Sequence, residues 1–489
     1  MAPGRGRRSF LRRLGASLAA SVALPGAARA QSTRPRRKPA ARKAPAKKAD
    51  AGKAASKPAA ARPAARVARL PEAPPLRVAQ GDWPVPPPGA LVDLAPARWI
   101  WLPCERTLAS TFVLFRRELT IDGEVASARG WVSADSRYRL FVNGRRVQWG
   151  PAPCDPRSYE VDPVDLGPHL RPGRNVIGAE VLYYGHGEGT WPGGKPGFLF
   201  ALHVEPKAGA ATTVVSDGSW RARLDRAHRP GQYKRWYLRA LQEDFDARLA
   251  PDRWSEPGVA VDASWVEPQV LELGADKPAA AGPHADYLTD GGVAAPGAVL
   301  RAREVPLLRE AERPFARMVR SGRVVWHRDP RDWFEFRMPG SYELAAGSSA
   351  TPSGDGAWTV EPAEGEGAFL TFELAEQMVG FPYVTVEAPA GAVVEVVTQE
   401  SHDPAGPAWL DTSRFSWTRF TCREGANRFE CFDYESLRFL QVHVHDATGP
   451  VVLRDVGVRR RSYPGRKRRA SPARSRSCSA SSRRRSTRS

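Results

Sequence analysis

The chain has 489 residues, of which 42% are hydrophobic, and a formal net charge of +20. This charge lies at the two ends: residues 1–69 hold 19 Lys/Arg and one acidic residue, and residues 459–489 hold 13 Lys/Arg and none. Residues 70–458 therefore carry a net charge of −11. Because the foldable part is acidic and the basic ends are low in complexity, the composition argues against a nucleic-acid-binding domain, and no nucleic-acid partner is predicted.

The N-terminus has the pattern of an export signal. Arg7 and Arg8 precede a modest apolar run, Leu14 to Leu24, which ends at Ala28-Arg29-Ala30. Residues 1–30 thus resemble a twin-arginine signal peptide and predict a periplasmic or secreted protein, the alternative being a basic disordered start. Residues 31–90 are rich in Ala, Pro, Lys and Arg and predict a disordered linker. No other apolar run has spanning length, so no membrane span is predicted.

Residues 91–210 predict an antiparallel β-sandwich or jelly-roll-like module. Its clearest element is the hairpin over residues 138–147, in which Tyr138, Leu140 and Val142 alternate with polar residues. Asn143-Gly144 then provides two residues that tolerate the positive φ of a type I′ turn. Neighbouring strands are predicted at 97–102, 111–120, 130–135, 175–182 and 198–204.

The remainder of the chain continues the β pattern. Residues 211–316 predict a Trp-rich β extension with a connecting loop, and residues 317–463 predict a second β-sandwich. Strands of this second module are expected at 369–374, 383–387, 393–397 and 439–445. The predicted fold class is therefore all-β, with two or more sandwich modules between disordered basic ends.

Residues 464–489 predict a disordered tail that is mostly Arg and Ser. After Pro464 the last 25 residues contain no Val, Leu, Ile, Phe, Tyr or Trp, so this segment has nothing with which to form a core. The abrupt loss of hydrophobic pattern in an Ala-, Gly-, Pro- and Arg-rich chain leads to the hypothesis of a shifted reading frame near Tyr463. A genuine basic tail that contacts an anionic polymer or cell surface is the alternative.

A series of short motifs resembles the bacterial α-L-rhamnosidases of glycoside hydrolase family 78. The resemblance runs from about Arg98 to Pro464 and rests on the order and spacing of motifs that are weak one by one. These motifs are Phe115-Arg116-Arg117, residues 133–138, residues 141–144, Gly150-Pro151, residues 173–176, residues 217–220, residues 246–248 and residues 432–439.

This resemblance implies a set of β-sandwich modules followed by an (α/α) barrel that hydrolyses terminal α-L-rhamnose with inversion, through two carboxylates. The sequence departs from that pattern, because residues 459–489 hold no Asp or Glu and nothing after Pro464 resembles a helical barrel. No catalytic residue is therefore assigned. The predicted function is the non-catalytic β-sandwich portion of an exported rhamnosidase-like protein, which binds or positions a rhamnose-containing oligosaccharide.

The predicted carbohydrate-binding residues are Tyr184, His186, Glu188 and Trp191, in a glycine-rich loop after a core strand. Tyr and Trp offer flat faces to a sugar ring, and His and Glu can hydrogen-bond its hydroxyls. Some family members bind rhamnose on this type of module with the help of calcium, but this loop lacks the adjacent Asp/Asn ligands, so no metal and no cofactor are predicted. The alternative is a structural loop whose aromatic residues pack against a neighbouring domain.

Other clusters of polar residues have plainer interpretations. His443 and His445 alternate on one strand before Asp446, and an exposed polar strand face is preferred over a metal site. Glu243, Asp244 and Asp246 are interpreted as an acid-rich turn, although a self-sufficient glycosidase that uses carboxylates of the β modules is retained as an alternative function. Cys422 and Cys431 flank a turn and are either bridged across a hairpin or two small buried residues.

Overall fold

The computed structural model describes residues 88–464, with gaps at 155–157, 186–193, 231–242, 272–298, 332–339, 348–349, 355, 409 and 411–416. Almost every element in these residues is a β-strand, and one 3₁₀ turn, η1 (Gly167–His169), accompanies them. The prediction of an all-β fold is confirmed. None of the described residues form a helix long and apolar enough to cross a membrane.

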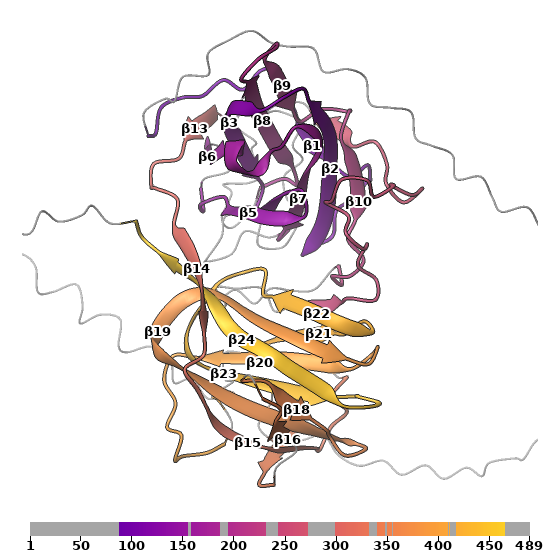
Figure 1. Cartoon of the computed structure of the whole chain (residues 1–489), viewed down its shortest axis with the longest axis vertical. Helices are drawn as coiled ribbons and strands as arrows, with labels where there is room; N and C mark the ends of the chain where they lie inside the picture. Colours follow the sequence, from indigo (N-terminus) through magenta and orange to yellow (C-terminus); the bar gives the residue numbers. More distant parts are fainter. Residues whose placement is uncertain are drawn as a thin grey trace, which may run out of the picture. The chain divides into compact units, whose positions relative to one another are not determined.

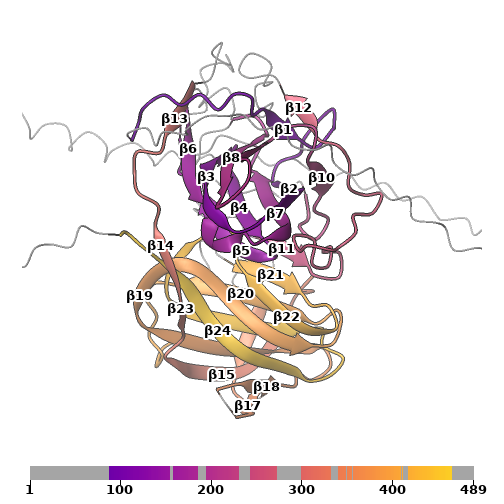
Figure 2. The ribbon, with the colours of Figure 1, turned by 45° about the horizontal axis from the view of Figure 1, so that its top comes forward.

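The first module, defined by two sheets that enclose a common core, is built from strands of the first 302 residues (Figures 1 and 2). The seven-stranded sheet has the order β12 (Gln269–Leu271), β1 (Trp99–Trp101), β8 (Phe198–Pro206), β3 (Val125–Ala134), β6 (Ser158–Asp165), β13 (Val299–Ala302), and β9 (Thr212–Val215) pairs with β8. The five-stranded sheet has the order β10 (Arg221–Leu224), β2 (Thr111–Ile121), β7 (Gly173–Tyr183), β4 (Arg137–Val142), β5 (Arg145–Gly150).

The core of the first module comes from residues that alternate along these strands. Val113 and Phe115 of β2, and Ala179 and Val181 of β7, belong to one buried cluster. Trp220 lies at its centre with no exposed surface, and its indole Nε1 donates to the carbonyl oxygen of Val215 at 2.8 Å. Because side chains of a strand alternate between faces, the residues between these core positions lie on the opposite face of the five-stranded sheet.

The second module, defined by one twelve-stranded sheet, follows from residue 309 onward and also includes β11 (Asp244–Asp246). Its main order is β11, β21 (Trp417–Thr421), β20 (Val393–Gln399), β23 (Glu435–His445), β19 (Glu366–Ala388), β24 (Val451–Ser462), β18 (Trp358–Val360), β17 (Ala350–Pro352). The further strands are β14 (Arg309–Pro314), which pairs with β24, β15 (Arg317–Trp326), which pairs with β16 (Tyr342–Ala345) and β19, and β22 (Gly425–Glu430), which pairs with β19.

One long strand, β19, joins the two layers of the second module (Figure 1). Its first half pairs with β15 and β23, and its second half pairs with β22 and β24. The sequence prediction divided it into two strands around Pro382, and the structure corrects this. Pro382 lies within the continuous strand, opposite Val458 of β24, beyond the point where the register with β23 shifts between Glu373 and Met378.

The cysteines near the turn at 423–427 do not form a disulfide. Cys422 and Cys431 are free thiols and are buried. Among the described residues Cys104 and Cys154 are free as well, the first exposed and the second half-buried. The expected hairpin geometry is absent because β21 pairs with β20, whereas β22 pairs with β19. The two cysteines therefore serve as small core residues, which was the alternative interpretation.

The predicted hairpin at 138–147 is present, with β4 and β5 joined by Asn143 and Gly144 at φ 52° and 83°. The Asn143 side chain also forms hydrogen bonds with β7, the other neighbour of β4 in the sheet. Its Nδ2 donates to Asn175 Oδ1 at 2.9 Å, and its Oδ1 accepts from the backbone N–H of Val176 at 3.0 Å. The turn is thus fixed both by backbone preference and by side-chain hydrogen bonds.

We expect Asn143→Ala to destabilise the protein by about 2–3 kcal/mol, because it loses these hydrogen bonds and places an alanine at positive φ. Asn143→Gly keeps the backbone freedom and loses only the side-chain bonds, so its loss is expected to be smaller. Chemical denaturation of both variants measures the difference. Equal stability of wild type and both variants would contradict this account of the turn.

Candidate functional site

Of the four predicted sugar-binding residues, the structure describes only Tyr184. His186, Glu188 and Trp191 lie outside the described residues, so their predicted role stays a prediction. Tyr184 is 3% exposed, and its hydroxyl donates to Asp433 Oδ2. Tyr184 was predicted to present its ring to a sugar, but the ring is packed inside the protein and offers no exposed face.

The outer face of the five-stranded sheet carries charged side chains and is nevertheless buried. Arg137 and Arg139 of β4 alternate with core residues, as does Glu180 of β7, and none of the three is more than 8% exposed. Alternation predicts that these residues point away from the first core, and they do. The structure adds that residues 225–228, 243–245 and 430–434 cover this face.

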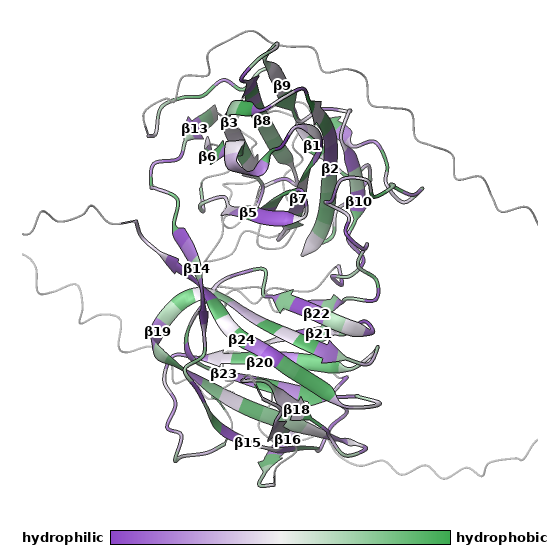
Figure 3. Cartoon of the chain, in the orientation of Figure 1, coloured by the Kyte–Doolittle hydropathy of each residue, from purple (hydrophilic) through white to green (hydrophobic). Residues whose placement is uncertain are grey.

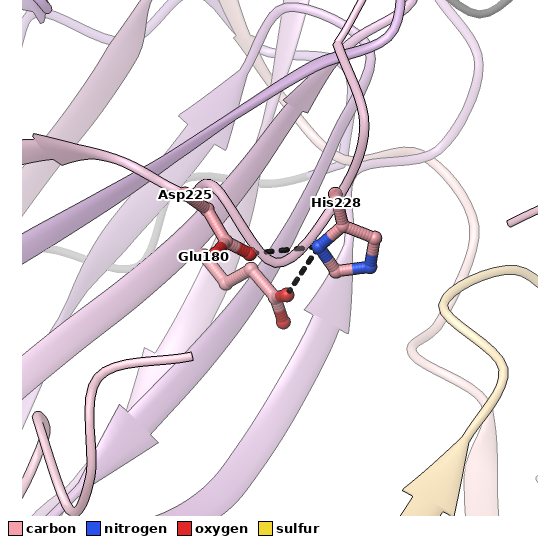
Figure 4. Close-up of side chains that lie close together, drawn as sticks. All are labelled: Glu180, Asp225 and His228. Atoms are coloured by element: carbon pink, nitrogen blue, oxygen red, sulfur yellow. Dashed lines mark hydrogen bonds and ion pairs between the residues drawn. The ribbon is translucent and has the colours of Figure 1, made fainter. Parts of the chain in front are cut away.

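His228 lies at the centre of a cluster of buried acids on this face (Figure 4). Its Nδ1 donates to Asp225 Oδ2 at 2.7 Å, and its Nε2 donates to Glu243 Oε1 at 3.3 Å. Glu180 Oε1 lies 3.8 Å from the same Nδ1, and the ring of Phe112 stacks on the imidazole at 3.7 Å. A fully buried histidine is thus enclosed by three carboxyl groups and an aromatic face.

Electrostatics favour the charged form of this histidine. Burial alone would lower the pKa of His228, but the hydrogen bonds to Asp225 and Glu243 outweigh it and raise the pKa to about 10. Burial raises the pKa of the Glu180 carboxyl, which Arg139 Nη1 at 3.7 Å partly offsets. At neutral pH His228 is therefore an imidazolium that donates from both ring nitrogens.

The cluster fits an ion-pair network better than a metal site. Among the residues that the structure describes, Glu180, Asp225 and His228 place metal-ligating atoms within 4.8 Å of one another. Both ring nitrogens of His228 already contact carboxylates, and calcium prefers six to eight oxygen ligands, which three such residues do not supply. The arrangement therefore holds two segments of chain against the sheet.

The acids considered for glycoside hydrolysis are engaged in the same way. Glu243 is 2% exposed, and its second oxygen accepts the backbone N–H of Phe432 at 2.6 Å. Asp246 accepts from Arg248 at 2.7 Å. Asp244 and Asp246 are half-buried, and each lies beside an arginine, Asp244 at 4.0 Å from Arg229. All three carboxylates considered for the alternative of a self-sufficient glycosidase are thus already held by hydrogen bonds or ion pairs.

Segment 430–434, defined as Glu430 to Tyr434, bonds to the same face of the five-stranded sheet. Arg137 Nε lies 3.2 Å from Asp433 Oδ1, with both side chains less than 5% exposed. Arg139 donates to the carbonyl oxygen of Glu430 at 3.0 Å, and Trp149 Nε1 donates to that of Phe432 at 2.9 Å. One apolar cluster completes the contact, and it consists of the rings of Phe112, Tyr184 and Phe432 and the aliphatic side chain of Leu182.

A second buried polar group lies within the second module. His443 and His445 are 0% and 1% exposed, so the expectation of an exposed polar strand face is wrong. Glu395 lies 2.8 Å from Arg419 and 3.6 Å from His445, while His443 Nε2 is 2.8 Å from Gln441 Oε1. The rings of Trp326 and Tyr342 cover the two histidines, a contact that strand alternation alone could not reveal.

Sequence reasoning missed Asp225 and His228. They are only three residues apart, but their partners Glu180 and Glu243 come from other parts of the chain. No spacing rule connects such residues before the sheet is assembled. The one available signal was the pair of arginines on β4, whose charges on an otherwise apolar strand required partners if that face was buried.

The described residues thus form two β modules that meet at a buried, charged face of the five-stranded sheet. Residues 123–285 match the α-L-rhamnosidase N-terminal domain family. Over these residues the match confirms the resemblance predicted from the motifs. No match was found among curated proteins.

Solved rhamnosidases have a similar fold. A family 78 rhamnosidase of Bacillus sp. GL1 has a TM-score of 0.58 at 18% identity, covering 76% of this chain and 56% of that one. An α-L-rhamnosidase of Aspergillus terreus has a TM-score of 0.48 at 20% identity, covering 76% of this chain and 36% of that one. This chain thus spans little more than half of the first enzyme and about a third of the second.

The ion pairs of His228 are expected to stabilise the folded protein at neutral pH and to be lost at alkaline pH. Because the folded-state pKa is raised above the unfolded value of about 6.5, the stabilisation is complete below that value and is lost as the pH rises towards 10. We expect the melting temperature of the wild type to fall between pH 7 and pH 10 more steeply than that of His228→Gln.

His327→Gln is the matched control, since His327 is 48% exposed and 3.8 Å from its acidic neighbour Glu343. This control should keep the wild-type pH slope, and differential scanning calorimetry across the range measures all three proteins. The network would be refuted as the source of the pH dependence if His228→Gln and the wild type had the same slope.

Proposed function

We propose that the β modules are the non-catalytic, carbohydrate-binding or carbohydrate-positioning part of a rhamnosidase-like glycoside hydrolase. The observation that carries this proposal is the match of residues 123–285 to the α-L-rhamnosidase N-terminal domain. The ligand is then a rhamnose-containing oligosaccharide. The buried contacts of segment 430–434 support a positioning role, because they hold the second module on the first through paired charges.

The loop after Tyr184 is the proposed contact with the sugar, through His186, Glu188 and Trp191. An aromatic face and hydrogen-bonding side chains beside glycines are suited to a sugar ring. Tyr184 contributes by anchoring the start of the loop, since its backbone N–H donates to Ser136 Oγ at 2.9 Å and its hydroxyl to Asp433.

We expect Trp191→Ala to weaken binding of a rhamnose-containing oligosaccharide about tenfold or more, because it removes the stacking face, while the melting temperature stays unchanged. Isothermal titration calorimetry measures the affinity. Tyr463→Ala is the control, because Tyr463 is a 67% exposed aromatic residue elsewhere in the chain. Unchanged affinity in Trp191→Ala would leave the loop with a structural role only.

The non-catalytic assignment has its own test. Purified full-length chain is incubated with an aryl α-L-rhamnoside, and release of the aryl alcohol is followed by absorbance. No turnover is expected. Turnover that survives repurification would favour the alternative of a self-sufficient glycosidase and would overturn the assignment.

We also propose export through the twin-arginine route, supported by Arg7-Arg8 ahead of a short apolar run, in residues outside the described part of the chain. Replacing both arginines by lysine should retain the protein inside the producing bacterium, because the pathway's receptor recognises the arginine pair. Fractionation and immunoblotting of the two forms measures this. Export of the lysine form at the wild-type level would contradict the proposed route.

A further inference from the structure

The second module has a cleft at the point where the chain crosses from one layer to the other. β14 pairs with β24 and β15 pairs with β19, and Phe315 and Ala316 connect the two strands. The backbone N–H of Phe315 donates to Val456 O at 3.0 Å, and that of Ala316 donates to Glu373 O at 2.9 Å. The crossing is thus fixed to both layers, and beside it lies a cavity of about 340 Å³.

The floor of this cleft is apolar and rich in aromatic residues. Phe372 and Leu453 are 5% and 1% exposed, and the rings of Phe315 and Phe372 lie 6.0 Å apart at 54°. Trp358 of β18 lines the cleft and is partly buried against the same core. The partly exposed rings of Phe315 and Trp358, which rest on buried Phe372 and Leu453, are suited to the apolar face of a sugar ring. The volume lies at the lower end of the range for small-ligand pockets.

The rim of the cleft is polar, and its side chains are held in place by ion pairs. Arg317, 67% exposed, donates from Nε and Nη2 to Glu373 Oε2 at 2.9 and 2.6 Å. Arg454, 56% exposed, pairs with Glu387. A guanidinium has five N–H donors, so each arginine keeps donors for a ligand after it has bound its carboxylate.

The charges around the rim balance one another. Asp455 lies 3.9 Å from Arg428, which also pairs with Glu312 at 2.8 Å, and Arg438 shares Glu373 with Arg317 at 2.7 Å. Each of the three charged residues that line the cleft, Arg317, Arg454 and Asp455, therefore has an oppositely charged neighbour. Because no lining charge is left without a partner, the cleft favours a neutral, hydroxyl-rich ligand over a phosphate or another anion.

We propose that this cleft binds the terminal 6-deoxyhexose of an oligosaccharide, with the methyl group on the aromatic floor and the ring hydroxyls at the charged rim. Within β24, Leu453 lies on the floor and the next two residues, Arg454 and Asp455, lie on the rim; Figure 3 shows that apolar and charged residues follow one another along this strand. A sugar with one apolar substituent matches such a floor and rim. This inference rests on the proposed carbohydrate-binding function, and it assigns a second contact, separate from the loop after Tyr184.

L-rhamnose and L-mannose are the probes, because they differ only in the hydroxyl that L-mannose carries on carbon 6. We expect the full-length chain to bind L-rhamnose about tenfold more tightly than L-mannose, since an apolar floor favours a methyl group over a hydroxyl. Isothermal titration calorimetry with each sugar measures the ratio. Equal affinities would overturn the assignment of the methyl group to the floor.

Two pairs of variants locate the site. Ala316→Trp fills the mouth of the cleft from an exposed position and should reduce rhamnose affinity tenfold or more, while Ala311→Trp, exposed on β14 but outside the cleft, should not. Arg454→Ala removes a rim donor and should reduce affinity several-fold. Arg460→Ala is its control, because Arg460 lies on the same strand as Arg454 and forms a similar, partly exposed ion pair with Glu376 of β19.

The outcomes separate the two proposals. Loss of binding in Ala316→Trp with a wild-type melting temperature supports the cleft. Binding that persists in Ala316→Trp and disappears in Trp191→Ala overturns the cleft and keeps the proposed function. A wild-type chain that binds neither L-rhamnose nor a rhamnose-containing oligosaccharide overturns the proposed function itself.

Discussion

The structure depends on the pairing of charges that are buried on the outer face of the five-stranded sheet. Removing an ionised group from water costs several kcal/mol, and this cost is offset only when a partner and hydrogen bonds replace the water. Arg137 meets Asp433 at 3.2 Å, and His228 is enclosed by Asp225, Glu180 and Glu243. If either partner of such a pair were absent, the other charge would remain buried and unpaired, so this face and the segments that cover it are stable only together.

This constraint explains why groups with the chemistry of a catalytic or metal site here have a structural role. Glu180, Asp225, Glu243 and His228 could serve acid–base chemistry in an open pocket, but all are buried and each is bound to a partner. The features that suit a ligand lie elsewhere, where aromatic rings and exposed charged side chains meet at the surface. The cleft beside Phe315 combines them, since its floor is apolar and its arginines are more than half exposed.

Much of the fold could be predicted because strand signals are local. The hairpin over 138–147 is specified by alternation and by Asn143-Gly144, and the structure has positive φ at both turn residues. The continuity of β19 could not be predicted, because Pro382 and the neighbouring glycine are typical of a break. Continuity is possible only because the strand changes partners from β23 and β15 to β22 and β24 along its length.

The sequence by itself determined the all-β class, most strand positions, the acidic charge of residues 70–458 and the resemblance to the rhamnosidases. The tertiary structure decided which polar faces are buried, because their partners are distant in the chain: Arg137 and Asp433 are 296 residues apart. Alternation places a side chain on one face of a strand but does not say what covers that face. For this reason Tyr184, His443 and His445 were expected at the surface and lie inside, while the cleft between β14 and β15 had no signal in the sequence.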